Sequence, residues 1–124
     1  MQLKNIKINK SNLKVKFAKT KQEHKQGLMG IDSLPEDQGM LFCYPGEQKM
    51  SFWMKDTKIP LSIAFIDKNK KIIAIEDMKP LDTSGTKFNN KAQWALEVNQ
   101  GWFEKNNIKL GDKVNFNFIT IKIT

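Results

Sequence analysis

Short apolar segments of strand length recur along this chain, and their spacing is the feature that most restricts its fold. The first two, 3–8 and 13–18, alternate apolar and polar residues, as half-buried strands do. Further segments of strand type lie at 39–44, 49–55, 61–66, 72–75, 94–98 and 114–122. Such closely spaced strands predict a mainly antiparallel sheet rather than alternating βαβ units.

Two short helices are also predicted. Thr20 and Glu23 have the spacing of a capping box, in which the threonine accepts from the Glu23 amide while the glutamate reaches back. The helix that follows ends within 27–30, where glycine can adopt the left-handed cap conformation. Asn99 can cap a second helix through 101–105.

The segment 78–93 shows no periodicity and is rich in loop-forming residues. A loop of this length in a compact domain is usually a binding lid or disordered. Pro45–Gly46 is expected to end the strand before it. The predicted fold is a single domain over residues 1–124, of class α+β, with mainly antiparallel β-strands in a small, barrel-like curled sheet and two short helices.

The fourth apolar segment runs directly into polar residues. Trp53 is followed by Lys55, Asp56 and Thr57, which places an aromatic ring beside three polar groups. Ligand pockets combine flat apolar surfaces with a few convergent polar groups, so we expect a ligand-binding pocket at this turn, with Trp102 as a second stacking surface and the long loop as a cover. In the alternative interpretation both tryptophans belong to the core, and Asp56 and Thr57 only satisfy turn amides.

Catalysis is a second hypothesis, because paired carboxylates can act as acid and base. Asp56, Asp67 and Glu97 could supply such a pair, although Asp67 fits a hairpin turn and Glu97 could pair with a lysine. His24 is the only histidine and the first candidate for acid–base chemistry near neutral pH, although its lysine neighbours favour a surface position. The catalytic candidates are therefore Asp56, Glu97 and His24, and the alternative function is a small hydrolase that uses carboxylates such as Asp56.

The sulfur-containing residues favour packing over chemistry. Cys43 is the only cysteine and lies in an apolar run, so we expect a buried, inert thiol and no intramolecular disulfide. Thioethers can bind Cu(I), but methionine commonly fills irregular gaps in a core. The methionines in question are Met29, Met40, Met50, Met54 and Met78. We expect no metal site and no cofactor.

The chain is basic, with 21 lysine and arginine residues against 13 acidic ones and a net charge of +8. Lysines alternate with apolar residues in the first two segments, as on solvated strand faces and protected sheet edges. The sequence has no arginine, so it lacks the bidentate fork that binds phosphate or guanine. We expect a monomer that binds a small molecule or a protein rather than nucleic acid, and no segment is long enough to span a bilayer.

Several motifs occur in a fixed order along the chain. They are Gly27-Leu28-Met29-Gly30, Leu34-Pro35, Gly39-Met40-Leu41-Phe42, Phe52-Trp53-Met54-Lys55-Asp56-Thr57, Ile59-Pro60-Leu61, Phe65-Ile66-Asp67, Leu96-Glu97-Val98, Gly101 and Gly111-Asp112-Lys113-Val114. Over about residues 13–118 this order resembles the bacterial and archaeal family catalogued as domain of unknown function 192. Relatives usually carry arginine at the position of Gln26 and commonly at that of His24, so an anion contact made by those arginines does not carry over to this chain. They often carry asparagine at the position of Asp56, so this chain has a carboxylate where they have an amide.

The resemblance implies a compact, strand-rich domain of uncharacterised activity, whose members are often exported behind an N-terminal signal. The expected location is therefore either exported or periplasmic, with the signal absent from this sequence, or cytoplasmic. Taken with the residues at the Trp53–Thr57 turn, it favours a non-catalytic ligand-binding or interaction domain.

Overall fold

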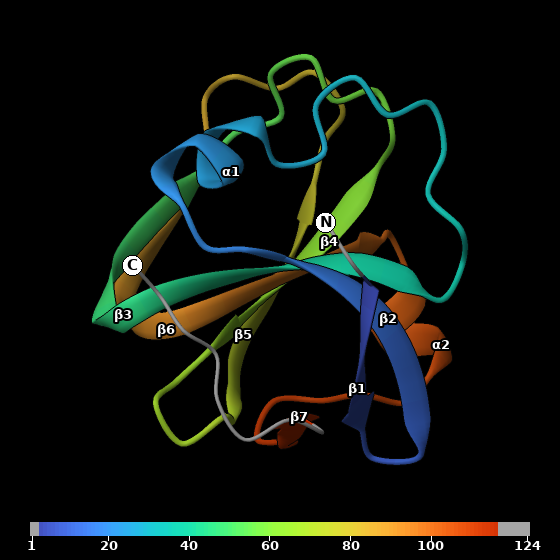
Figure 1. Cartoon of the computed structure of the whole chain (residues 1–124), viewed down its shortest axis with the longest axis vertical. Helices are drawn as coiled ribbons and strands as arrows, with labels where there is room; N and C mark the ends of the chain where they lie inside the picture. Colours follow the sequence, from blue (N-terminus) through green and yellow to red (C-terminus); the bar gives the residue numbers. More distant parts are fainter. Residues whose placement is uncertain (1–2, 117–124) are drawn as a thin grey trace.

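A computed structural model describes residues 3–116, which form one curled seven-stranded sheet and two short helices (Figure 1). In chain order the elements are β1 (Leu3–Ile8), β2 (Ser11–Ala18), α1 (Lys21–Gln26), β3 (Gln38–Phe52), β4 (Leu61–Ile66), β5 (Ile72–Met78), β6 (Thr86–Asn99), α2 (Trp102–Lys105) and β7 (Val114–Phe116). The predicted class, a mainly antiparallel, barrel-like curled sheet with two short helices, is confirmed. No helix among residues 3–116 is long and apolar enough to cross a membrane.

The strands lie in the order β5-β4-β6-β3-β2-β1-β7. Among the strand pairs within residues 3–116, only β2 and β3 are parallel, because α1 and the loop after it return the chain before β3 begins. The two end strands approach each other where Lys71, just before β5, forms a bridge with Lys113, just before β7. The Val114 amide donates to the Lys70 carbonyl oxygen at 2.8 Å beside this bridge. The curled sheet is thus fastened at its ends.

The two faces of the sheet bury different clusters, because successive side chains of a strand point to opposite faces. One face, which we call the α2 face, buries Leu41 and Leu96 together with Trp102 of α2. The other, which we call the α1 face, buries Phe42 and Ala95 with Leu28, the residue that follows α1 closely. Both faces are covered, so every residue of β4 is buried.

Strand β3 is longer than predicted. The expectation that Pro45–Gly46 ends a strand is wrong, since β3 continues to Phe52. Its pairing with β6 shifts register between Cys43 and Gln48, so the proline lies in an irregular stretch of the ladder. Proline lacks an amide hydrogen and is tolerated at such bulges. The predicted strand 49–55 is the second half of β3, which ends before Trp53.

Strand β6 begins earlier than predicted, so the expected loop over 78–93 is also wrong. Residues 79–85 form the loop, and from Thr86 onward the chain pairs with β3, with Thr86 opposite Phe52 and Phe88 opposite Met50. The polar residues in this part of β6 are mostly exposed. Their composition therefore reflects exposure of the strand rather than an absence of regular structure.

One of the two predicted helix caps is present and the other is not. The capping box of α1 is confirmed, since the Glu23 amide donates to Thr20 Oγ1 and the Thr20 amide donates to Glu23 Oε1, each at 3.0 Å. The predicted Asn99 cap is wrong: Gly101 is the N-cap of α2, and the Asn99 amide group donates to the Leu34 carbonyl oxygen at 2.8 Å. The predicted last strand is described as β7, and its remainder lies outside the described residues.

Candidate functional site

A pocket of about 340 Å³ lies on the α1 face of the sheet, which we call the Glu97 pocket. It is lined by His24, Lys25, Gln26, Gly27, Leu28, Met29, Phe42, Tyr44, Ser51, Phe52, Trp53, Met54, Thr57, Thr83, Ser84, Gly85 and Glu97. These residues come from α1 and the turn after it, from β3, from the loops around 53–57 and 83–85, and from β6. Its volume falls at the small end of the range of ligand pockets.

Backbone hydrogen bonds hold together the three loops that surround the pocket. The Gly30 amide donates to the Asp56 carbonyl oxygen at 2.9 Å, and the Met54 amide donates to the Asp82 carbonyl oxygen at 2.7 Å. The Thr57 amide closes the turn by donating to the Met54 carbonyl oxygen at 3.1 Å. Asp56 has φ of 53°, a left-handed conformation that aspartate adopts more readily than most residues. The 53–57 turn therefore links the segment after α1 to the loop before β6.

Aromatic rings form much of the pocket wall. Phe42 and Phe52, from the two halves of β3, meet edge to face with ring centroids 5.0 Å apart. The His24 ring lies over Tyr44, with ring centroids 4.4 Å apart. Trp53 stands at the rim with 43% of its surface exposed. An apolar ligand group would find flat surfaces on several sides of the pocket.

Glu97 is the buried acid of the pocket. It lies on β6 opposite Met40 of β3 and Ile63 of β4, and only 4% of its surface is exposed. The hydrogen bonds and ion pairs found among residues 3–116 include none to its carboxyl group. The expected pairing of Glu97 with a lysine is therefore absent from the described chain. Burial raises the pKa of Glu97 to about 8, because a charged carboxylate loses its hydration there.

His24 lines the same pocket but is tied to the backbone. Its Nε2 lies 2.8 Å from the Ala18 carbonyl oxygen and 3.0 Å from the Cys43 carbonyl oxygen. Carbonyl oxygens only accept hydrogen bonds, so Nε2 carries the hydrogen and donates to both. The imidazole thus fastens α1 to the end of β2 and to Cys43 within β3, and only Nδ1 is left to face a ligand.

The structure separates the four residues predicted at the turn. Trp53 and Thr57 line the pocket, whereas Lys55 and Asp56 do not. Lys55 is exposed, and its Nζ lies 5.3 Å from the centroid of the Trp53 ring. Thr57 is buried, and its hydroxyl donates to the Lys55 carbonyl oxygen at 3.0 Å. A role for any of the four in binding stays a prediction.

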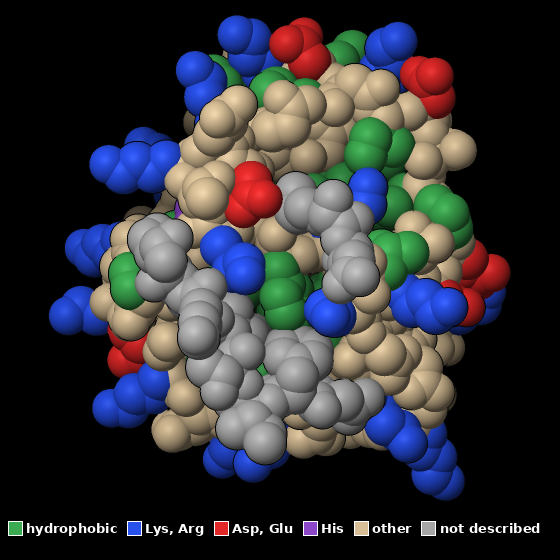
Figure 2. All heavy atoms as spheres, viewed as in Figure 1, with side chains coloured by type: hydrophobic (Ala, Val, Ile, Leu, Met, Phe, Trp, Pro, Cys, Tyr) green, Lys and Arg blue, Asp and Glu red, His purple; other side chains and the backbone are tan. Residues whose placement is uncertain are grey.

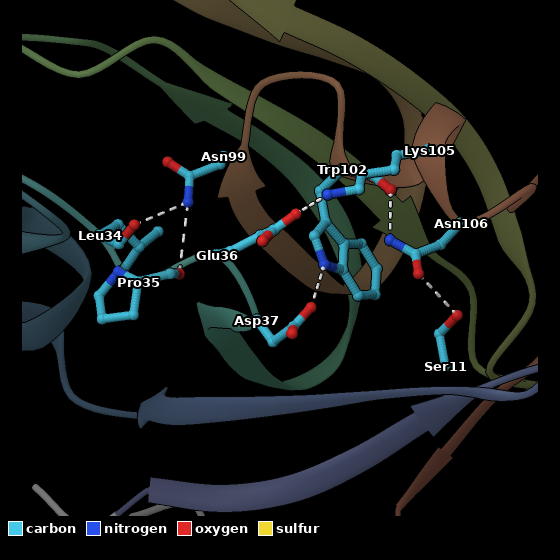
Figure 3. Close-up of polar contacts among 9 residues, drawn as sticks. All are labelled: Ser11, Leu34, Pro35, Glu36, Asp37, Asn99, Trp102, Lys105 and Asn106. Atoms are coloured by element: carbon cyan, nitrogen blue, oxygen red, sulfur yellow. Dashed lines mark hydrogen bonds and ion pairs between the residues drawn. The ribbon is translucent and has the colours of Figure 1, made fainter.

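Trp102, the predicted second stacking surface, lies on the α2 face and does not line the Glu97 pocket. It is buried, and its Nε1 donates to Asp37 Oδ1 at 3.0 Å (Figure 3). Nearby, Lys105 of the same helix pairs with Glu36. These contacts join α2 to the segment that leads into β3, which is a structural use of the tryptophan ring.

The remaining candidates do not gather around the pocket. Of the three carboxylates that could form a catalytic pair, only Glu97 lines it. Asp67 Oδ1 accepts from the amides of Asn69 and Lys71, each at 2.9 Å, as a hairpin residue does. Cys43 is buried, and burial raises its pKa to about 12. No group of three or more potential ligands among histidine, cysteine, aspartate and glutamate occurs in the described part of the chain.

Sequence reasoning missed most of the pocket wall. Phe42, Tyr44 and Phe52 were predicted as strand residues. The pattern of apolar residues along a strand does not show that a cavity lies over them. Ser84 lies in the loop predicted as a lid and does line the pocket. Glu97 itself was one signal for the pocket. It lies within the otherwise buried run Trp94–Val98, and a glutamate is seldom buried without a partner for its charge.

The basic charge is not concentrated on the face shown in Figure 2. Lysine side chains there lie around the outline of the molecule and between apolar patches, with acidic side chains among them. The two ion pairs of the described chain, Lys58 with Asp32 and Lys105 with Glu36, are exposed. This face has the appearance of a mixed, solvated surface.

A curled, mainly antiparallel sheet, with α1 and three loops around the pocket on one face, is a small β-rich fold. Within that class, the chain belongs to the family of domain of unknown function 192, described as "Uncharacterized ACR", whose model matches residues 4–116. No curated protein matches the sequence. The resemblance read from the motifs is therefore confirmed.

Two solved structures share this fold. A putative transcription regulator from Sinorhizobium meliloti 1021 is 25% identical, with a TM-score of 0.89 over 92% of this chain and 93% of that one. A protein of unknown function from Novosphingobium aromaticivorans DSM 12444 is 27% identical, with a TM-score of 0.86 over 92% of this chain and 85% of that one. Both support a β-rich fold that spans nearly the whole chain.

Proposed function

We propose that this protein binds a small molecule in the Glu97 pocket, beside the Trp53–Thr57 turn, without converting it chemically. The proposal rests on the Glu97 carboxyl group, which is buried, lines the pocket and has no hydrogen-bond or ion-pair partner within residues 3–116. Burial deprives the Glu97 carboxylate of hydration, which costs free energy. A bound molecule that pairs with this carboxyl group would recover that cost.

A binding role suits the pocket better than a catalytic one. General acid–base chemistry needs a second positioned group. Of the titratable neighbours in the pocket, His24 donates through Nε2 to backbone carbonyls, and burial raises the pKa of Tyr44 to about 12. The Asp56 carboxylate is exposed and does not line the pocket, so the hydrolase alternative has less support from geometry.

A ligand screen by thermal shift and tryptophan fluorescence tests the proposal. Trp53 is half exposed whereas Trp94 and Trp102 are buried, so ligand-induced changes in fluorescence report mainly on the pocket rim. We expect hits whose affinity falls in Trp53→Ala and is unchanged in Leu110→Ala, which removes an exposed apolar side chain that does not line the pocket. A screen without hits, or hits that bind both variants equally, would overturn the proposal.

A further inference from the structure

We propose that the ligand of the Glu97 pocket is a small organic cation, an amine whose charged nitrogen pairs with the Glu97 carboxylate while its apolar part lies against the aromatic wall. This inference rests on the proposed binding function and names the chemical class of the ligand. The observation behind it is that the Glu97 carboxyl group has no hydrogen-bond or ion-pair partner within residues 3–116. Glutamate is almost never fully buried without a partner, and no lysine of the described chain supplies one.

The pocket wall suits a cation as well as an apolar group. Phe42, Tyr44, Phe52 and Trp53 all line it, and the faces of aromatic rings attract positive charge. Lys55 already places its Nζ 5.3 Å from the centroid of the Trp53 ring at the rim. An aromatic wall beside one buried acid is the arrangement that binds an ammonium group with an apolar substituent.

Two of the five hydroxyl groups that line the pocket, those of Thr57 and Ser84, favour a ligand that donates hydrogen bonds, whereas those of Tyr44, Ser51 and Thr83 can also donate. Thr57 Oγ1 donates to the Lys55 carbonyl oxygen at 3.0 Å, and Ser84 Oγ donates to Asp82 Oδ1 at 2.7 Å. Each hydroxyl has used its only hydrogen, so its oxygen can now only accept. In the neutral imidazole that donates through Nε2, the His24 Nδ1 is an acceptor as well. These three groups add acceptors, not donors, to the carboxylate, and an ammonium group carries the matching N–H donors.

The protonation of Glu97 gives a test that needs no variant. Burial raises its pKa to about 8, so near neutral pH the carboxyl group of the empty pocket is mostly protonated. A cation must displace that proton, and its affinity should rise about tenfold per pH unit up to about pH 8. The other titratable groups that line the pocket are His24 and Lys25 of α1 and Tyr44 of β3, and the facing residues of β4 and β6 add none.

Calorimetric titration with three ring compounds of similar size separates the ligand classes: benzylammonium, the neutral benzyl alcohol and the anionic benzoate. We expect benzylammonium to bind wild-type protein at least about tenfold more tightly than benzyl alcohol, because a charge-assisted hydrogen bond is the stronger kind. Below about pH 8 its binding should release a proton, measurable in buffers of different ionisation enthalpy. Glu97→Gln should lose this preference, and Glu104→Gln, which changes an exposed carboxylate of α2, should keep it.

The outcomes are distinct for the two proposals. Benzyl alcohol binding as tightly as benzylammonium, benzoate binding best, an affinity that does not change with pH, or no binding of any of the three would each overturn the cationic ligand. The binding function itself would survive those results if other hits of the ligand screen still weaken in Trp53→Ala. It would fall if no ligand of any charge depends on Trp53 or Glu97.

Discussion

Gly39 of β3 and Glu97 of β6 lie so close that a Cβ atom on Gly39 would be 2.5 Å from the Glu97 carbonyl oxygen. That distance is shorter than real Cβ contacts allow, and the obstructing atom belongs to backbone that cannot turn aside. The absence of a side chain at Gly39 therefore lets β6 approach β3 at the point where the buried acid of the pocket is placed.

Gly39→Ala should destabilise the fold, because the added methyl group forces β3 and β6 apart. We expect a loss of about 1–3 kcal/mol in the free energy of unfolding, the usual range for overpacking a core. Urea denaturation followed by tryptophan fluorescence measures it. Gly46→Ala in the same strand is the matched control, since a Cβ there meets no atom within 4 Å. Equal stabilities of the two variants would contradict the close approach.

Glu97 should make the protein less stable as the pH rises. Its pKa is about 8 in the folded chain against 4.5 for an unperturbed glutamate, so in this window the unfolded chain releases a proton that the folded chain keeps. The stabilisation that the neutral Glu97 carboxyl group provides is fully present below pH 4.5 and is lost as the pH rises toward 8. Above pH 8 the free energy of unfolding no longer changes through this group. The expected slope reaches about 1.4 kcal/mol per pH unit.

Denaturation of wild type and Glu97→Gln from about pH 5 to about pH 8 tests this slope. The variant cannot ionise at this position, so its stability relative to wild type should increase with pH. Glu23, Asp82 and Asp112 have lowered pKa values because hydrogen bonds favour their ionised forms, so their effects fall below this window. Glu104→Gln should track wild type throughout. A constant difference between Glu97→Gln and wild type would mean that the carboxyl group is not desolvated.

The parts of the fold that the sequence predicts are those that depend on neighbours in the chain. The Thr20–Glu23 capping box follows from a spacing of a few residues and is present, and the hairpin turn that Asp67 fits joins β4 to β5. The limits of β3 and β6 depend on each other instead. Pro45 is accommodated because β6 pairs past it with a shifted register, and the polar residues after Thr86 are strand because β3 extends to meet them. No local rule contains that reciprocal pairing.

The candidate site was predicted in part for the same reason. Trp53 and Thr57 line the pocket because the turn that carries both residues forms part of its wall. Their closeness in the sequence was enough to predict that they lie together. Glu97 comes from β6, far from this turn in the sequence, and reaches the pocket only through the sheet order. Trp102 has the same side chain as Trp53 but lies across the sheet, because its helix packs on the opposite face.

Trp102→Phe should lower stability and leave ligand affinity unchanged. The shorter ring leaves space in the core and removes the hydrogen bond to Asp37, so we expect a loss of about 1–3 kcal/mol. Asp37→Asn keeps an oxygen acceptor for the indole and should cost less. Thermal denaturation and titration with a hit from the ligand screen measure the two effects. A variant of normal stability with weakened ligand binding would restore Trp102 to the binding residues.

His24→Ala should destabilise the fold because the Ala18 and Cys43 carbonyl oxygens lose their shared donor. We expect a loss of about 1–2 kcal/mol in urea denaturation, as for a hydrogen bond removed from partly buried groups. Lys25→Ala, the exposed neighbour on α1, should be close to wild type and serves as the control. Nitrogen-15 NMR of the neutral imidazole should show the hydrogen on Nε2. A hydrogen on Nδ1, or a stable His24→Ala protein, would free the ring from the backbone and return His24 to the candidates for acid–base chemistry in the pocket.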